Sequence, residues 1–219
     1  NVDMAKIKYE FLAHYYKAHA RPLRAWLFGN IETVNRVGCA LAPVSNWVAE
    51  SVPSRLAMAA IGIAPRRSLP PFARQTFTDW FSGRKGLKSD RKVVLFHDTY
   101  LTYNYPNIGM GATRLFEAAG IEVVLAEKRC CGRPMLSSGM IDAVKANVAF
   151  NVESLYACVK VGYDIVGFEP SYVSMLTDDY LDLTRDPRAR AVSENTYTAE
   201  EYLNLLNEGG KLQLPFSET

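Results

Sequence analysis

Two adjacent cysteines are the most distinctive chemical feature of this sequence. Cys130 and Cys131 come directly after an apolar stretch that predicts a strand, and Gly132 follows them. A disulfide between neighbouring residues closes a strained ring, so we expect two thiols that point in different directions from one turn. Such a pair suits a multinuclear iron–sulfur cluster better than one tetrahedral metal ion, and Gly132 allows a positive φ or a close backbone approach. The alternative is a pair of buried, small apolar side chains.

Basic side chains flank the cysteine pair. Lys128, Arg129 and Arg133 are expected to lower the thiolate pKa values. A thiol-redox role and a zinc site are two further interpretations of the pair. Cys39 and Cys158 are expected in helices, and four cysteines in 219 residues are too few for a disulfide scaffold. Because the first residues show no apolar secretory signal, we expect reduced thiols in the cytoplasm.

Three polar side chains stand at the ends of other predicted strands. His97 and Asp98 follow one strand, and Glu169 follows another. Both carboxylates are expected to cap the helices that come next rather than to act as an acid–base pair. His97 is expected either to be buried and hydrogen-bonded or to belong to a site at the strand ends.

The remaining candidates indicate no catalytic centre. His14 and His19 lie five residues apart on a predicted helix, so they do not stack for one metal ion. Gly109 and Gly111 only loosely resemble a phosphate-binding loop, and no Gly-x-Ser-x-Gly motif is present. We therefore assign no catalytic residue.

The second half of the chain alternates between strand and helix patterns. Apolar runs predict strands over 93–96, 121–126 and 164–168, and helical spacing predicts helices over 108–119, 141–161 and 171–183. Gly120 is expected to end the first of these helices. Three strand–helix units predict a small parallel sheet. Ligands of such sheets bind beyond the carboxyl ends of the strands, where 97–99, 129–132 and 169–172 stand.

The first half is predicted to be helical. One helix follows Asp3 as its cap, and a second runs from Pro22 to Val37 with Gly38 at its end. Five prolines then separate short segments, and a polar stretch follows at 82–91. The predicted fold class is α/β: a helical N-terminal segment followed by a small parallel sheet of about three βα units.

The small net charge of +2 conceals an imbalance between the halves. Residues 1–91 carry 14 basic and 6 acidic side chains, and residues 92–219 carry 11 basic and 17 acidic. Aromatic residues of the basic half fall mostly on apolar stripes, which argues against nucleic acid as a partner. Docking of another domain is the favoured explanation, with an anionic membrane surface as the alternative. No apolar run reaches the roughly 20 residues that span a bilayer.

Several stretches resemble one known family. KRCCGRPMLSSGM (128–140) is similar to the Cys-Cys-Gly signature of the cysteine-rich CCG domain. This domain occurs in the B subunit of heterodisulfide reductase, in the iron–sulfur subunit of glycolate oxidase and in the C subunit of anaerobic glycerol-3-phosphate dehydrogenase. The segments 1–16, 95–109 and 167–180 most strongly resemble bacterial FAD-linked oxidases fused to an iron–sulfur region.

The resemblance implies an electron-transfer function. Cys130 and Cys131 would ligate an iron–sulfur cluster of the 4Fe–4S type, or shape its site together with Gly132. The parent enzyme would oxidise a 2-hydroxy acid such as lactate or glycolate, with FAD in an upstream domain. Its flavin and ferredoxin-like domains would be the partners of this region, and a quinone or redox protein would accept the electrons. The expected location is the cytoplasm, including the inner face of the membrane.

The sequence also departs from the family pattern. Thr99 and Tyr172 stand where the fullest pattern has cysteines, and Cys158 comes too early to replace the second of them. Two thiolates are fewer than the about four ligands of a cluster. The chain is therefore expected to be a fragment: a helical connector (1–91), a CCG module (92–184), and an extension or linker toward a second module (185–219). A cluster-free docking scaffold between flavoprotein and electron acceptor is the alternative function.

Overall fold

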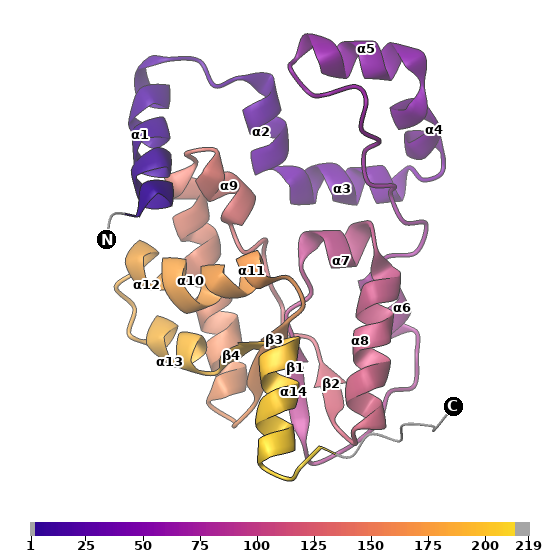
Figure 1. Cartoon of the computed structure of the whole chain (residues 1–219), viewed down its shortest axis with the longest axis vertical. Helices are drawn as coiled ribbons and strands as arrows, with labels where there is room; N and C mark the ends of the chain where they lie inside the picture. The colour runs from indigo at the N-terminus through magenta and orange to yellow at the C-terminus, as the bar shows by residue number, and fades with distance from the viewer. Residues whose placement is uncertain (1–2, 213–219) are drawn as a thin grey trace.

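The computed structural model describes residues 3–212, which form a helical N-terminal segment and an α/β part (Figure 1). The helical segment contains α1 (Met4–Ala18), α2 (Leu23–Gly29), α3 (Ile31–Ala40), α4 (Val44–Glu50), α5 (Val52–Ala60) and α6 (Phe77–Ser82). Asp3 caps α1 as predicted, because its Oδ1 accepts hydrogen bonds from the backbone N–H groups of Ala5 and Lys6. The predicted fold class is confirmed.

Four parallel strands form the sheet, in the order β2-β1-β3-β4. They are β1 (Lys92–Leu95), β2 (Glu122–Val124), β3 (Asp164–Gly167) and β4 (Thr196–Thr198). The first three match the predicted runs. The fourth was not predicted, because Thr-Tyr-Thr has no apolar run to mark it. It lies in the segment expected to be an extension or linker, whose described part also forms α13 (Arg188–Glu194) and α14 (Ala199–Glu208).

Helices cover both faces of the sheet. Alternate residues of each strand point to opposite faces, so Val94 and Ile165 belong to one apolar cluster, whereas Val93 and Val166 belong to the other. The first cluster is covered by α10 (Ile141–Val159), α12 (Tyr180–Leu183) and α13. The second is covered by α6, α8 (Pro106–Ala118) and α14. Figure 1 shows α10, α12 and α13 on one side of the strands, α6 and α8 on the other, and α14 in front of them.

Short helices connect the strand ends to the larger helices. They are α7 (Thr99–Tyr103), α9 (Arg133–Ser137) and α11 (Pro170–Ser174), the last followed by a π-helical turn, η1 (Met175–Asp179). Gly120 follows α8 with a φ of 75°, as predicted for the end of that helix.

The second predicted helix differs in two ways from the expectation. It is divided at Asn30 into α2 and α3, and α3 continues past Gly38 to Ala40. Gly38 serves for close packing, because a Cβ there would lie 2.4 Å from the Phe72 ring.

Candidate functional site

The Cys130–Cys131–Gly132 turn lies between the carboxyl end of β2 and the start of α9. Both cysteines are buried, with exposed fractions of 2% and 3%. Gly132 has a φ of 99° and is the residue before α9. A Cβ at this position would also lie 2.9 Å from Val144 Cγ1. Both the backbone conformation and the packing therefore require glycine here.

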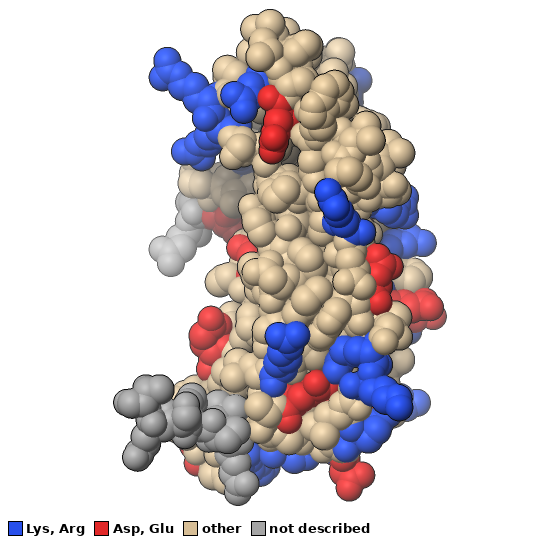
Figure 2. Space-filling model, turned by 90° about the vertical axis from the view of Figure 1, so that its right-hand side faces the viewer, with Lys and Arg blue, Asp and Glu red and all other residues tan. Residues whose placement is uncertain are grey.

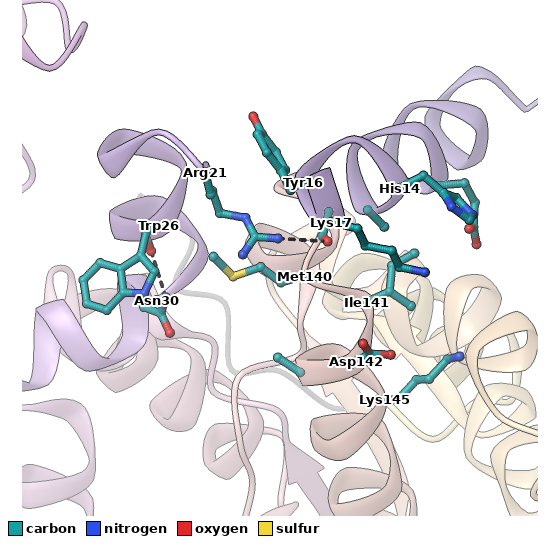
Figure 3. Close-up of a pocket in the computed structure, with 14 residues that line it drawn as sticks. His14, Tyr16, Lys17, Arg21, Trp26, Asn30, Met140, Ile141, Asp142 and Lys145 are labelled. Carbon is teal, nitrogen blue, oxygen red and sulfur yellow. Dashed lines mark hydrogen bonds between the residues drawn. The ribbon is translucent and has the colours of Figure 1, made fainter. Parts of the chain in front are cut away.

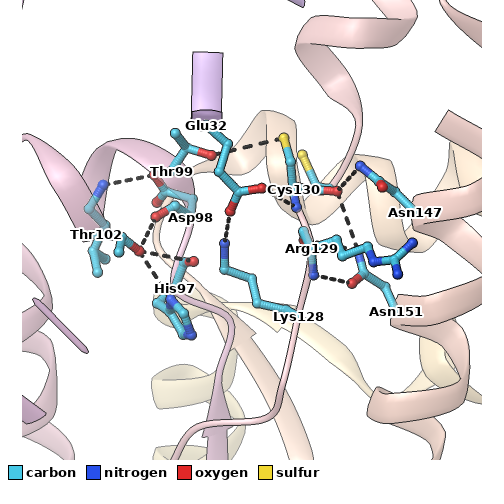
Figure 4. A network of polar contacts seen from close by, with 12 residues as sticks. Glu32, His97, Asp98, Thr99, Thr102, Lys128, Arg129, Cys130, Asn147 and Asn151 are labelled. Atoms are coloured by element: carbon cyan, nitrogen blue, oxygen red, sulfur yellow. Dashed lines mark hydrogen bonds and ion pairs between the residues drawn. The ribbon is translucent and has the colours of Figure 1, made fainter. Parts of the chain in front are cut away.

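Two asparagines of α10 anchor the turn (Figure 4). The Asn151 carboxamide oxygen accepts from the Arg129 N–H at 2.7 Å, and its NH₂ donates to the Arg129 carbonyl at 3.1 Å. Asn147 donates to the Cys130 carbonyl at 3.1 Å. The Tyr180 hydroxyl accepts from Asn151 and donates to the Cys131 carbonyl at 3.0 Å. The backbone polar groups of the buried turn are thus paired by side chains.

A third anchor comes from the helical segment. Glu32, in the first turn of α3, accepts a hydrogen bond from the Cys130 N–H at 2.8 Å through Oε2. Its other oxygen, Oε1, accepts from Lys128 Nζ at 3.1 Å. The Lys128 side chain is 5% exposed, and its ammonium lies 5.9 Å from the centre of the Phe96 ring. Figure 4 shows Glu32 reaching the turn from the opposite side to the two asparagines.

The two thiols have different acidities. The pKa of Cys130 is lowered to about 7, chiefly because the Cys131 thiol hydrogen-bonds to its sulfur and secondarily through the Gly132 N–H. The pKa of Cys131 is raised by burial and by the neighbouring Cys130. Of the two thiols, Cys130 is therefore the one that loses its proton first.

The expectation that basic residues lower the thiol pKa values holds for Lys128, and for Arg133 at Cys131 through its backbone N–H rather than its guanidinium. Lys128 lowers the pKa of both cysteines, as a minor cause. The Arg133 guanidinium instead pairs with Asp179 at 2.6 Å, and the Arg129 guanidinium lies 4.5 Å from the centre of the Phe150 ring. Burial outweighs the remaining positive charge at Cys131.

Residues from the other strand ends face the turn. Thr99 Oγ1 lies 3.9 Å from Cys130 Sγ. Tyr172 is 7% exposed, and burial raises the pKa of its hydroxyl, as do the nearby Asp98 and Cys131. Two positions that carry no thiol in this chain, Thr99 and Tyr172, thus stand next to the cysteine pair.

The polar residues singled out at the strand ends have structural contacts. Asp98 caps α7 through a 2.9 Å bond from the Leu101 N–H, and Glu169 caps α11 through a 3.0 Å bond from the Tyr172 N–H, as predicted. His97 Nδ1 lies 3.0 Å from Thr102 Oγ1. Burial and nearby Lys128 lower the pKa of His97 to about 3, so it is neutral at pH 7.

The other predicted candidates lie apart from the turn. His19 bonds to the Tyr15 carbonyl at the end of α1, and Cys39 donates to the Tyr103 carbonyl. His14 lines a groove of about 520 Å³ between α1, α2 and the start of α10. Figure 3 shows that Arg21 crosses this groove to bond the Gly139 carbonyl, and that Trp26 lies at its far end.

The turn supplies two ligands for a metal centre. Within residues 3–212, no three His, Cys, Asp or Glu side chains are grouped closely enough to hold a metal ion. An iron–sulfur cluster takes about four ligands. The paired, buried thiols on an anchored turn fit one side of such a cluster, and the described residues do not complete it.

Sequence reasoning missed four anchoring residues. Asn147 and Asn151 carried a usable signal, because they lie on the buried side of the predicted helix 141–161 among valines and one leucine. Unpaired amides are costly in such a position, so they need a defined polar partner. Glu32 carried no local signal, since it lies 98 residues from Cys130, and Tyr180 could not be told from an ordinary core tyrosine.

The fold and the site define a class of protein. A parallel sheet with a Cys-Cys-Gly turn after its second strand is a cysteine-rich α/β domain. Residues 94–168, from β1 to the end of β3, match the family model described as the CCG cysteine-rich domain. This match bears out the resemblance to the CCG domain that the sequence predicted.

Curated relatives carry the likeness further along the chain. It is similar to the C subunit of anaerobic glycerol-3-phosphate dehydrogenase of Escherichia coli strains K12 and O157:H7. Each is 29% identical over 163 residues, which cover 72% of this chain and 41% of the relative. The aligned part thus spans about two fifths of their length. No solved structure matches.

Proposed function

We propose that this chain is part of an iron–sulfur electron-transfer subunit of a dehydrogenase. The observation that carries the proposal is the cysteine turn itself: two buried thiols on a backbone held by Glu32, Asn147, Asn151 and Tyr180. The CCG family and the similarity to a dehydrogenase subunit support the same function.

In this proposal Cys130 and Cys131 are cluster ligands, and the remaining ligands come from outside residues 3–212. A bound cluster supplies one-electron transfer. The chain's own residues hold the thiols in place, and burial excludes water from them. The lowered pKa of Cys130, caused chiefly by the Cys131 thiol, favours the thiolate form that binds a metal.

The substrate and the flavin belong to the rest of the enzyme. By resemblance to FAD-linked oxidases, we propose that an FAD domain oxidises a 2-hydroxy acid of the lactate or glycolate type. Electrons then pass through the cluster to a quinone or a redox protein. Assays of the full-length enzyme with lactate, glycolate and glycerol 3-phosphate test this directly, since oxidation of glycerol 3-phosphate alone would contradict the substrate assignment.

The helical segment is proposed to dock the partner redox domains. Among the described residues, fifteen of the twenty exposed large apolar side chains lie in residues 4–69. Trp47 on α4 is 74% exposed, and Leu56 on α5 is 68% exposed. Figure 2 views the side of the molecule that carries these helices and shows largely uncharged surface over its upper and middle parts. An apolar surface of this kind is typical of a binding interface.

The proposed location is the cytoplasm, and peripheral contact with the inner face of the membrane is the alternative that the helical segment suggests. All four cysteines are free thiols, which fits a reducing compartment. The exposed apolar side chains and the basic charge of the helical segment support contact with an anionic surface. No helix within residues 3–212 is both long and apolar enough to cross a bilayer. Cell fractionation tests the membrane contact, and recovery only in the soluble fraction at low salt would contradict it.

A cluster-free docking scaffold is the second candidate. It is favoured by one observation: Tyr172 and Thr99, rather than further thiols, stand beside the cysteine pair. In this case the turn would be a purely structural element of the core.

Iron and acid-labile sulfide separate the two candidates. The full-length protein is purified without oxygen as wild type, as Cys131→Ser and as Cys158→Ser. Cys158 is half-buried in α10 and serves as the matched control. We expect iron and sulfide in the wild type and in Cys158→Ser, with a clear loss in Cys131→Ser. Background iron in the wild type would favour the scaffold instead.

A further inference from the structure

One side chain of the helical segment enters the cysteine turn. Glu32 is separated by 98 residues from Cys130 and by 96 from Lys128, yet it bonds both. The two contacts use different carboxylate oxygens, at 2.8 Å to the Cys130 N–H and 3.1 Å to Lys128 Nζ. Glu32 keeps 26% of its side chain exposed, whereas Lys128 keeps 5%. Hydrogen bonds to a carboxylate are stronger than neutral ones.

The peptide unit before Cys130 is held at both edges by two distant parts of the chain. Its carbonyl, which belongs to Arg129, accepts from Asn151 of α10. Its N–H, which belongs to Cys130, donates to Glu32 of α3. The next peptide unit is held through the Cys130 carbonyl by Asn147. Since a peptide unit is planar, fixing both units fixes the φ and ψ of Cys130, and with them the direction of its Cβ.

The same contact controls where the Cys130 N–H points. Another N–H group of the turn donates to sulfur, since the Arg133 N–H lies 3.4 Å from Cys131 Sγ. The Cys130 N–H is instead taken by Glu32. Without an acceptor, this buried group would lack a partner or would draw the turn into another conformation.

We propose that Glu32 is a positioning residue for Cys130: its carboxylate holds the Cys130 N–H and the Lys128 ammonium together, and thereby orients the thiol for its ligand role. The inference rests on the proposed function of the turn, but it concerns the backbone and does not require a bound cluster. It assigns the first turn of α3 to the redox site, although the rest of the helical segment carries an exposed apolar surface.

Amide hydrogen exchange at Cys130 tests the proposal. Wild type, Glu32→Ala, Glu32→Gln and the control Glu50→Ala are compared in the full-length protein. Glu50 is an exposed glutamate of α4. Loss of a charge-assisted bond predicts roughly 10- to 100-fold faster exchange in Glu32→Ala. Glutamine keeps an acceptor oxygen, so Glu32→Gln is expected to stay within about tenfold of wild type. Glu50→Ala is expected to match wild type.

Two results would overturn the inference. One is unchanged exchange at Cys130 in Glu32→Ala. The other is equally fast exchange at Cys130 in Glu32→Ala and Glu32→Gln. The glutamine oxygen can still accept the hydrogen bond, so equal rates would show that this bond does not protect the Cys130 N–H. If Glu32→Ala does not fold, Glu32→Asp carries the test: its shorter side chain draws the carboxylate back from the Cys130 N–H, so exchange at Cys130 is expected to be roughly tenfold faster, and exchange equal to wild type would overturn the inference. Iron content is measured in parallel. Absence of iron would contradict the proposed function, whereas unchanged amide exchange would contradict the role of Glu32, so the two failures can be told apart.

Discussion

The helical segment and the α/β part differ in how they bury apolar side chains. In α10, Val144, Val148, Val152 and Leu155 are all fully buried, whereas α4 and α5 contain no buried residue. The α/β part thus builds a core of its own. The helical segment adds only a few residues to that core, among them Tyr9 and Phe77, and leaves many large apolar side chains exposed.

Helix α3 makes several of the specific contacts of the helical segment. Asn35 donates to Asn104 at 2.7 Å, Gly38 packs against Phe72, and Glu32 reaches the cysteine turn. The difference between the two parts teaches that burial alone does not show where function lies. The part with less core of its own still supplies one anchor of the candidate site.

A matched pair of leucines tests the difference most strongly. Leu155 is fully buried in α10, and Leu56 is 68% exposed on α5. Leu155→Ala is expected to lower the free energy of unfolding by about 2–5 kcal/mol, because it removes buried methyl groups and leaves a cavity. Leu56→Ala is expected to change it by less than about 0.5 kcal/mol. Urea denaturation measures both, and equal losses would show that α5 has a core of its own.

The polar anchor on α10 is expected to have the next largest effect. Asn151→Ala removes the partner of the Arg129 N–H and of buried carbonyls, which costs roughly 1–3 kcal/mol for each group left unpaired. The control is Asn204→Ala, an exposed amide on α14 that bonds Glu208. Thermal unfolding compares the two variants. A loss in Asn151→Ala no larger than in Asn204→Ala would mean that the turn holds its shape without this side chain.

The pH dependence of the free energy of unfolding distinguishes His97 of the α/β part from His14 of the helical segment. His97 has a folded pKa of about 3, below its ordinary 6.5. It therefore stabilises the fold above about pH 6.5, and this contribution is lost as the pH falls toward 3. The expected loss attributable to His97 by pH 5 is about 2 kcal/mol.

The measurement is urea denaturation at pH 7 and pH 5. His97→Gln is expected to reduce the difference between the two pH values. His14→Gln, at an exposed position of α1, is expected to leave it unchanged. An undiminished acid effect in His97→Gln would assign the effect to another group. Glu122 is not that group, because its pKa is lowered from 4.5 to about 2, chiefly by Lys88, and its contribution is lost only below about pH 4.5.

The smallest effect on stability is expected on the proposed docking surface. Trp47→Glu changes an exposed side chain, so the free energy of unfolding should move by no more than about 0.5 kcal/mol. Binding to the partner redox domain should weaken tenfold or more if Trp47 lies at the centre of the interface, at about 1.4 kcal/mol per factor of ten. Titration calorimetry with the purified partner measures this. Unchanged affinity would remove α4 from the interface.

The sequence was sufficient for features that depend on local patterns. Three apolar runs located β1, β2 and β3, and Asp3, Asp98 and Glu169 were correctly expected to cap helices. Strand β4 was missed because its three residues gain their place from pairing with β3 and not from an apolar pattern.

The candidate site was predictable only in part, because its anchors are distant in sequence. The cysteine turn was predicted from its own residues. No residue near Glu32 in the sequence indicates that Glu32 contacts Lys128 and the Cys130 N–H. The unequal acidity of Cys130 and Cys131 also depends on geometry, since the two buried thiols interact and the pKa of Cys130 is lowered while that of Cys131 is raised. Composition cannot rank two adjacent residues of the same type.

The span of the Glu32 contact has a consequence for the order of folding. The asparagine contacts to the turn close loops of 17 to 22 residues, whereas Glu32 closes one of 98. The entropy cost of closure rises with loop length, so the local contacts are expected to form first. In an early intermediate the turn is then fixed by α10 alone, with the Cys130 N–H still without its carboxylate. If a cluster were inserted at that stage, the Cys130 side chain would not yet have a fixed orientation. Docking of α3 would then fix the orientation of the Cys130 thiol.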